Sequence, residues 1–223
     1  MGKIYHSKPK LNYWLFLFVI GTGVLLYYLY GDDITIRDIL TFTPSNSYLA
    51  GLFILAMFLF KSVSVFFSIG VIYMVSGIVF PDYIAIPLNI VGTGIGMTYS
   101  YYIGYFSMGE GGNYYLQKYD KLDGIFNKVA VNGWFTTFII RVIGIIPHDI
   151  VGIILGSLKV PYIKYITASI IGVSPILIAT TVIGISISNP NSKEFLYAVI
   201  GRLIIALMAT ILYPLVLKMS KIK

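Results

Sequence analysis

The sequence FIIRVIGIIPHDIVGIIL runs from Phe138 to Leu155. One arginine, one histidine and one aspartate interrupt an otherwise apolar run, together with a proline and two glycines. A proline inside a helix removes a backbone hydrogen bond and clashes with the preceding turn. The stretch therefore predicts two short apolar helices joined by a break, with charged side chains close to that break.

The composition of the whole chain places this stretch in a membrane. Apolar residues make up 57% of the 223 residues, and charged residues make up only 11%. An ordinary globular domain carries about 25% charged residues. Several uncharged runs reach the roughly 20 residues that a helix needs to cross a bilayer. We therefore expect an all-α integral membrane protein with multiple spanning helices.

Two apolar regions are too long for one crossing and too short for two. These regions are Tyr48–Phe80 and Val129–Leu158, and the second contains the opening stretch. Both fit a re-entrant hairpin of two half-helices, whose non-helical tip must be shielded by protein or water. A full span is predicted after each hairpin, at Pro87–Phe106 and at Pro161–Ile185.

This pattern predicts three segments. Residues 1–47 form an N-terminal anchor helix and an outer loop, residues 48–185 form the core, and residues 186–223 form a last transmembrane helix with a basic tail. If the N-terminus is cytoplasmic, eleven lysines fall inside, whereas only Arg37 and Lys193 fall outside. Cytoplasmic loops carry an excess of lysine and arginine. We therefore expect a multi-pass protein of the cell membrane with both termini in the cytoplasm.

The chain also resembles itself when it is shifted by 80 residues. Pro81 then aligns with Pro161, and Lys61 aligns with Arg141. Because the predicted topology gives the two copies opposite orientations, the two hairpins form an inverted repeat, an arrangement common among transporters. The glycine pairs aligned by the same shift are Gly92 with Gly172 and Gly104 with Gly184.

Several function classes are excluded by residue usage. The chain has no cysteine and two histidines, which argues against zinc, iron–sulfur and thiol chemistry, so no metal and no cofactor are expected. No nucleophile or paired acid and base is visible, so an enzyme is not expected. The net charge of +7 fits cytoplasmic loops and anionic lipid head groups better than nucleic acid.

Two runs of sequence resemble a known family. YMVSGIVFPDYIAIPLNIVGTGIGMTYSYYIGYFSMGEGG is similar to the first signature of the DedA-like, or VTT-domain (SNARE-associated), membrane proteins. NGWFTTFIIRVIGIIPHDIVGIILGSLKVPYIKYITASIIGVSP is similar to the second, and the likeness covers about Ser62 to Gly184. The resemblance implies a lipid-transporting fold with two opposed re-entrant loops. Its members are linked to flipping or scrambling of phospholipids or polyprenyl phosphates and to membrane homeostasis.

The candidate site residues follow from charge and from chain breaks. Arg141 and Lys61 are predicted to bind a lipid phosphate, because a guanidinium is always charged and holds phosphate with two parallel bonds. Asp149 either orients Arg141 or carries protons, and His148 either relays protons or makes a polar contact. A purely structural role for Arg141, paired with Asp149 or capping freed carbonyls, stays open. The residues predicted to shape the hairpins are Pro147, Gly144, Gly152, Gly77 and Gly156.

The sequence thus predicts a flippase-like or scramblase-like transporter of phosphate-bearing lipids. A small-anion transporter, a proton-coupled secondary transporter and a non-catalytic membrane scaffold are the alternatives. The expected partners are membrane lipids with anionic head groups, and the oligomeric state, a homo-oligomer included, stays open.

Overall fold

The computed structural model describes residues 36–63, 68–107, 129–144 and 146–220, and over these residues the chain is helical, without strands. The predicted anchor helix within residues 1–30 and the predicted cytoplasmic loop at 108–128 lie outside the described residues. The described helices are α2 (Ile36–Phe42), α3 (Ser47–Val63), α4 (Ile69–Val79), α5 (Asp82–Ser107), α8 (Val129–Ile143), α9 (His148–Ser157), α10 (Tyr162–Ser186) and α11 (Lys193–Ser220).

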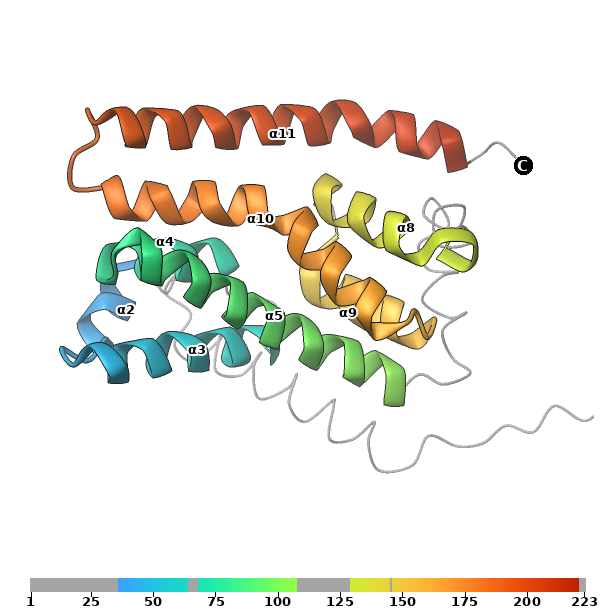
Figure 1. Ribbon diagram of the computed structural model, residues 1–223, viewed down its shortest axis with the longest axis horizontal. Coiled ribbons are helices and arrows are strands. Elements are labelled where there is room, and N and C mark those ends of the chain that lie inside the picture. The colour runs from blue at the N-terminus through green and yellow to red at the C-terminus, as the bar shows by residue number, and fades with distance from the viewer. Residues whose placement is uncertain (1–35, 64–67, 108–128, 145, 221–223) are drawn as a thin grey trace, which may run out of the picture.

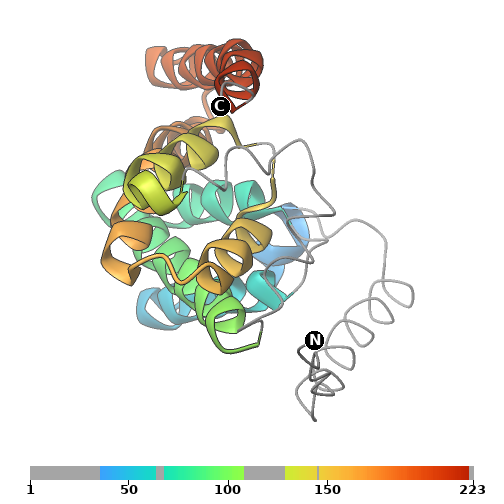
Figure 2. The ribbon, with the colours of Figure 1, turned by 90° about the vertical axis from the view of Figure 1, so that its right-hand side faces the viewer.

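Six of these helices form two units of the same design (Figure 1). The first unit contains α3, α4 and α5, and the second unit contains α8, α9 and α10. In each unit two shorter helices precede a long one, with 17, 11 and 26 residues in the first and 15, 10 and 25 in the second. Helix α11 packs along α10 at the edge of the bundle, as Figures 1 and 2 show.

The short second helix of each unit packs against the long helix of the other unit, so α4 lies on α10 and α9 lies on α5. Glycines bring these backbones together. A Cβ atom added to Gly77 of α4 would collide with the carbonyl oxygen of Thr181 in α10. One added to Gly156 of α9 would collide with the carbonyl oxygen of Tyr101 in α5. Both glycines thus lie at helix contacts, where small residues let two backbones approach closely.

The long helices supply glycines to the same two contacts. A Cβ atom on Gly184 of α10 would collide with the carbonyl oxygen of Met74, and one on Gly104 of α5 would collide with that of Ile153. These two glycines are 80 residues apart and were aligned by the sequence shift. The inverted orientation of the two units in a membrane stays a prediction.

Two of the described helices are long and apolar enough to cross a membrane, by length and composition. They are α10 and the Lys193–Ile211 part of α11. Helix α5 covers the predicted span 87–106 and has sufficient length, but it is not among them. Its polar side chains Asn89, Thr93 and Ser100 lower the mean hydropathy of the helix. These side chains are buried inside the protein.

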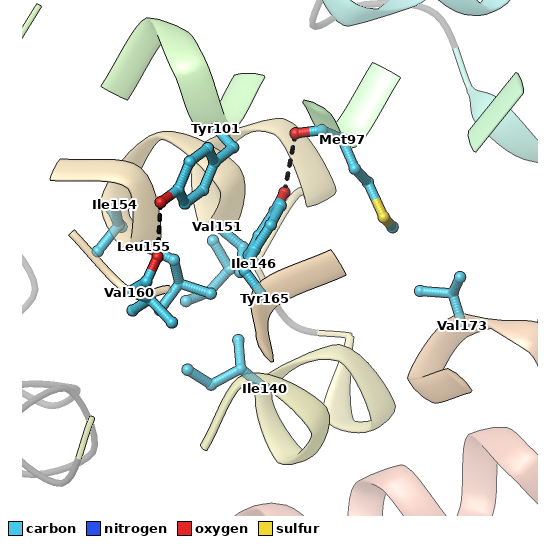
Figure 3. Packing of buried hydrophobic residues seen from close by; sticks show 10 residues of the cluster. All are labelled: Met97, Tyr101, Ile140, Ile146, Val151, Ile154, Leu155, Val160, Tyr165 and Val173. Carbon is cyan, nitrogen blue, oxygen red and sulfur yellow. Dashed lines mark hydrogen bonds between the residues drawn. The ribbon is translucent and has the colours of Figure 1, made fainter. Parts of the chain in front are cut away.

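The core around α9 is built on two tyrosines. The rings of Tyr101 from α5 and Tyr165 from α10 stack with their centroids 4.7 Å apart. Figure 3 shows that the Tyr101 hydroxyl donates to the carbonyl oxygen of Val160 and that the Tyr165 hydroxyl donates to that of Met97. Buried tyrosines usually find such partners. These bonds fix α5 and α10 relative to each other beside α9.

The connections gather at the two ends of the bundle (Figure 1). The α2–α3 and α10–α11 connections lie at one end. The C-terminal end of α5, the α9–α10 connection and the C-terminal end of α11 lie at the other. The long helices therefore run from one end of the molecule to the other.

Candidate functional site

The second unit is interrupted where the sequence predicts a break. Helix α8 ends at Ile143, and Gly144 follows with φ of 65°, a left-handed conformation that glycine adopts without strain. Pro147 then stands with φ of −50° and ψ of 137° directly before α9. In the first unit Ser68 has a similar extended conformation before α4, with ψ of 123°.

These interruptions gather four side chains, Lys61, Arg141, His148 and Asp149, which we call the charged cluster. Lys61 lies in the last turn of α3 and Arg141 in the last turn of α8, while His148 and Asp149 begin α9. Lys61 is only 7% exposed and Arg141 only 3% exposed. Because a buried charge without partners is heavily penalised, each cation requires polar contacts inside the protein.

Lys61 satisfies this requirement with an ion pair across the two units. Its ammonium group bonds to the carboxylate of Asp149. When the side chains are taken alone, that of Lys61 is 9% exposed and that of Asp149 is 13% exposed, so both are largely buried. Breaking a buried pair by removing one partner costs about 3–5 kcal/mol, because the other charge is left uncompensated. The pair therefore ties the end of α3 to the start of α9.

Arg141 is held by neutral groups. Its Nε donates to the hydroxyl of Ser169 at 3.0 Å, and its Nη2 donates to the hydroxyl of Tyr165 at 2.9 Å. Its Nη1 donates to the carbonyl oxygen of His148 at 2.8 Å and lies 3.2 Å from the Nδ1 atom of the same residue. The guanidinium group is thus fixed by α9 and α10, and no carboxylate of the described residues is in hydrogen-bond contact with it.

The sequence leaves a pairing of Arg141 with Asp149 open as one alternative, and in the structure Asp149 pairs with Lys61 instead. Successive residues of a helix point about 100° apart. His148 faces Arg141, so Asp149, one residue further along α9, faces α3 and Lys61 instead. Its charge still acts on Arg141 through space, and the charges of both cations act on His148. The two predicted phosphate ligands thus lie around one carboxylate.

Gly144 lies at the chain break, whereas the other three glycines predicted to shape the hairpins lie at helix contacts. Gly77 and Gly156 allow the close approach of the paired helices described above. A Cβ atom on Gly152 would come within 3.0 Å of the Tyr165 hydroxyl and near the side chain of Ser100. Gly152 therefore leaves room for the tyrosine that holds Arg141.

The sequence gives little sign of the polar groups that complete the site. Tyr165 and Ser169 are four residues apart and so share one face of α10, but that spacing alone does not assign them to Arg141. A second buried group lies between α4, α5 and α10. There the Tyr73 hydroxyl bonds to that of Thr93 at 2.9 Å, and the Asn89 amide donates to Thr181 at 2.8 Å.

Comparison with known proteins decides the family. The sequence model of the VTT domain matches residues 67–186, which is more than half of the chain. The chain belongs to the VTT domain family. The matched VTT domain includes α4, α5, α8, α9 and α10 and begins after Lys61, so it carries three members of the charged cluster. No curated protein and no solved structure matches the chain.

The charged cluster of this VTT domain protein carries an excess of positive charge. Lys61 and Arg141 against Asp149 leave one net positive charge, with His148 counted as neutral. In the part of the chain that the structure describes, no three His, Asp or Glu side chains gather in a way that would hold a metal ion. The charged cluster itself consists of fixed charges and hydrogen-bond donors.

Proposed function

We propose that this protein moves phosphate-bearing lipids, such as phospholipids or polyprenyl phosphates, across the cell membrane in the manner of a flippase or scramblase. The observation that carries this proposal is the buried charged cluster, which has one net positive charge and lies where the interrupted helices of the two units meet. The barrier to lipid crossing is the charged head group, because an unpaired ion in hydrocarbon is heavily penalised. Fixed positive charge inside the membrane lowers that barrier for a phosphate.

The architecture supports the same proposal. We take α3 with α4 and α8 with α9 as two opposed re-entrant hairpins of an inverted repeat. The corresponding glycine contacts of the two units support this view, and so does the position of the charged cluster at both interruptions. Transporter sites commonly lie near the midplane, between repeats with discontinuous helices. The head group would pass along the hairpin tips while its tails stay in the lipid.

The two cations have different tasks in this mechanism. Arg141 is held in place by Ser169, Tyr165 and His148, and it offers a pre-oriented guanidinium fork to phosphate. Lys61 is paired with Asp149, so a phosphate that reaches it must compete with that carboxylate. Such competition keeps binding weak enough for release, which a transporter needs.

The proposed topology is tested by labelling. The chain has no cysteine, so single cysteines can be introduced without background. Ser45 and Asn191 are exposed and lie in the connections found at one end of the bundle. We expect cysteines at both positions to react with a membrane-impermeant maleimide in intact cells, and a cysteine at Lys121 to react only after permeabilisation. Reaction at Lys121 in intact cells contradicts the proposed topology.

Transport is tested with purified protein in vesicles. Labelled phosphatidylglycerol, a polyprenyl phosphate and a phosphate-free glycolipid are each placed in one leaflet, and loss of label to the other is followed with and without protein. We expect the protein to speed the two phosphate-bearing lipids and to leave the glycolipid at the protein-free rate. Equal rates for all three lipids contradict phosphate recognition. Release of trapped chloride or inorganic phosphate without lipid movement favours the small-anion alternative.

A further inference from the structure

One buried acceptor in the first unit lacks a donor. Asn89 of α5 is fully buried, and its Nδ2 donates to the Thr181 hydroxyl at 2.8 Å and to the Tyr73 carbonyl oxygen at 3.4 Å. The Thr181 hydroxyl itself donates to the carbonyl oxygen of Leu177, so both neighbours act as acceptors and fix the orientation of the amide. The Asn89 Oδ1 atom is left without a hydrogen-bond partner among the described residues.

The second unit indicates which donor would pair with the free acceptor of Asn89. Within the first unit a Cβ atom on Gly92 would meet the ring of Phe58, and within the second unit one on Gly172 would meet Phe138 and the Cβ atom of Arg141. The aligned phenylalanines and glycines therefore lie at the α3–α5 contact and at the α8–α10 contact. Three residues after each phenylalanine comes the buried cation, Lys61 or Arg141. Three residues before each glycine come Asn89 and Ser169, respectively.

The two cations differ in their partners. Arg141 bonds to Ser169, its counterpart on the long helix of its own unit, at 3.0 Å. Lys61 instead crosses to Asp149 in the second unit, while its counterpart Asn89 keeps a free acceptor. A lysine ammonium group has three donors and no acceptor, and its long flexible stem allows it to change partner.

We propose that Asn89 Oδ1 is a second position for the Lys61 ammonium group, occupied when Lys61 leaves Asp149. Lys61 then makes the contact in its own unit that Arg141 makes in the second. In one position the lysine ties the two units together, and in the other it releases Asp149 and frees the hairpin tips from each other. The role of this change of partner in lipid movement rests on the proposed function, whereas the second position of Lys61 does not.

A mutant cycle tests the second position through stability. Asp149→Asn removes the carboxylate and leaves Lys61 dependent on Asn89, so Asn89→Leu has a larger effect in that background than in the wild type. We expect Asn89→Leu to lower the melting temperature by about 5 °C more in the Asp149→Asn protein than in the wild type, a size typical of coupled contacts. In a Lys61→Met background the extra loss disappears, because the coupling passes through the lysine. Additive effects with Lys61 present contradict the proposal.

Cross-linking provides a test that does not depend on the stability of Asp149→Asn. In the cysteine-free chain, Lys61→Cys with Asn89→Cys is compared with the matched pair Arg141→Cys and Ser169→Cys, using a short thiol-reactive cross-linker. We expect both pairs to cross-link, whereas Phe60→Cys with Asn89→Cys does not, because Phe60 is half exposed on another face of α3. Cross-linking of the 141–169 pair alone overturns the correspondence. If the wild type moves no lipid but these results hold, the proposed function fails and the second position stands.

Discussion

Replacing Arg141 with glutamine is expected to reduce lipid movement to the rate of protein-free vesicles. Arg141 supplies the permanent, pre-oriented positive charge of the site, and without it Lys61 and Asp149 cancel each other. The substitution also removes donors from buried acceptors on Ser169, Tyr165 and His148. An acceptor left unsatisfied costs about 1–3 kcal/mol, so we also expect a melting temperature lower by roughly 5–10 °C.

Two further variants separate loss of charge from loss of fold. Arg141→Lys keeps the charge but offers one nitrogen instead of a planar fork, so it should restore transport only in part. Arg202→Gln is a matched control, because Arg202 is a less buried arginine that donates to Thr180 and lies outside the charged cluster. We expect it to transport at nearly the wild-type rate. A folded Arg141→Gln protein with wild-type transport would refute the proposed role of Arg141.

The second large effect is expected from a single methyl group. Gly156→Ala places a Cβ atom against the Tyr101 carbonyl oxygen and within 3.0 Å of the Tyr105 backbone nitrogen. Backbone atoms of a packed helix cannot rotate aside, so α9 must move away from α5. Overpacking of this kind costs about 1–3 kcal/mol, and displacement of α9 also strains the ion pair of Asp149 with Lys61. We expect a loss of roughly 10 °C in melting temperature.

Gly201→Ala is the matched control for this substitution. Gly201 lies in α11, and a Cβ atom there would meet nothing within 4 Å. Alanine is favoured over glycine in helices by about 1 kcal/mol, so this variant should melt at or slightly above the wild-type temperature. Thermal unfolding of both purified variants in the same detergent measures the difference. Equal melting temperatures would show that the α5–α9 contact tolerates a wider separation.

Much of the helical framework could be predicted from the sequence. Gly144 and Pro147 interrupt an apolar run, and the structure has the interruption there because proline and left-handed glycine both end regular helices. The shift of 80 residues aligns Lys61 with Arg141, and in the structure both cations are buried and bonded to the first turn of α9, at Asp149 and His148 respectively. Residue type and spacing were sufficient to predict the interruption and the alignment of the two cations, because both can be read from the local sequence.

The partners of the charged residues could not be predicted in the same way. The long helices of the core carry small polar residues among apolar ones, so periodicity does not show which face meets which neighbour. Tyr165, Ser169 and Asn89 are single polar residues among many in long helices, and only their positions in space assign them to Arg141 or leave them unpaired. For the same reason the sequence could not decide which cation pairs with Asp149, since a shift of one residue along α9 changes the partner.

The packing of each short helix on the long helix of the other unit also determines the order in which the chain can assemble during synthesis. Helix α9 reaches a partner that already exists, because α5 precedes it in the chain. Helix α4 emerges early but packs on α10, so its glycine-lined face has no partner until residues beyond Tyr162 have been made. Contacts between distant parts of a chain form slowly. We therefore expect the first half of a nascent chain to stay incompletely packed until the second half is made, and a truncation before α10 to leave α4 without the long helix on which it packs.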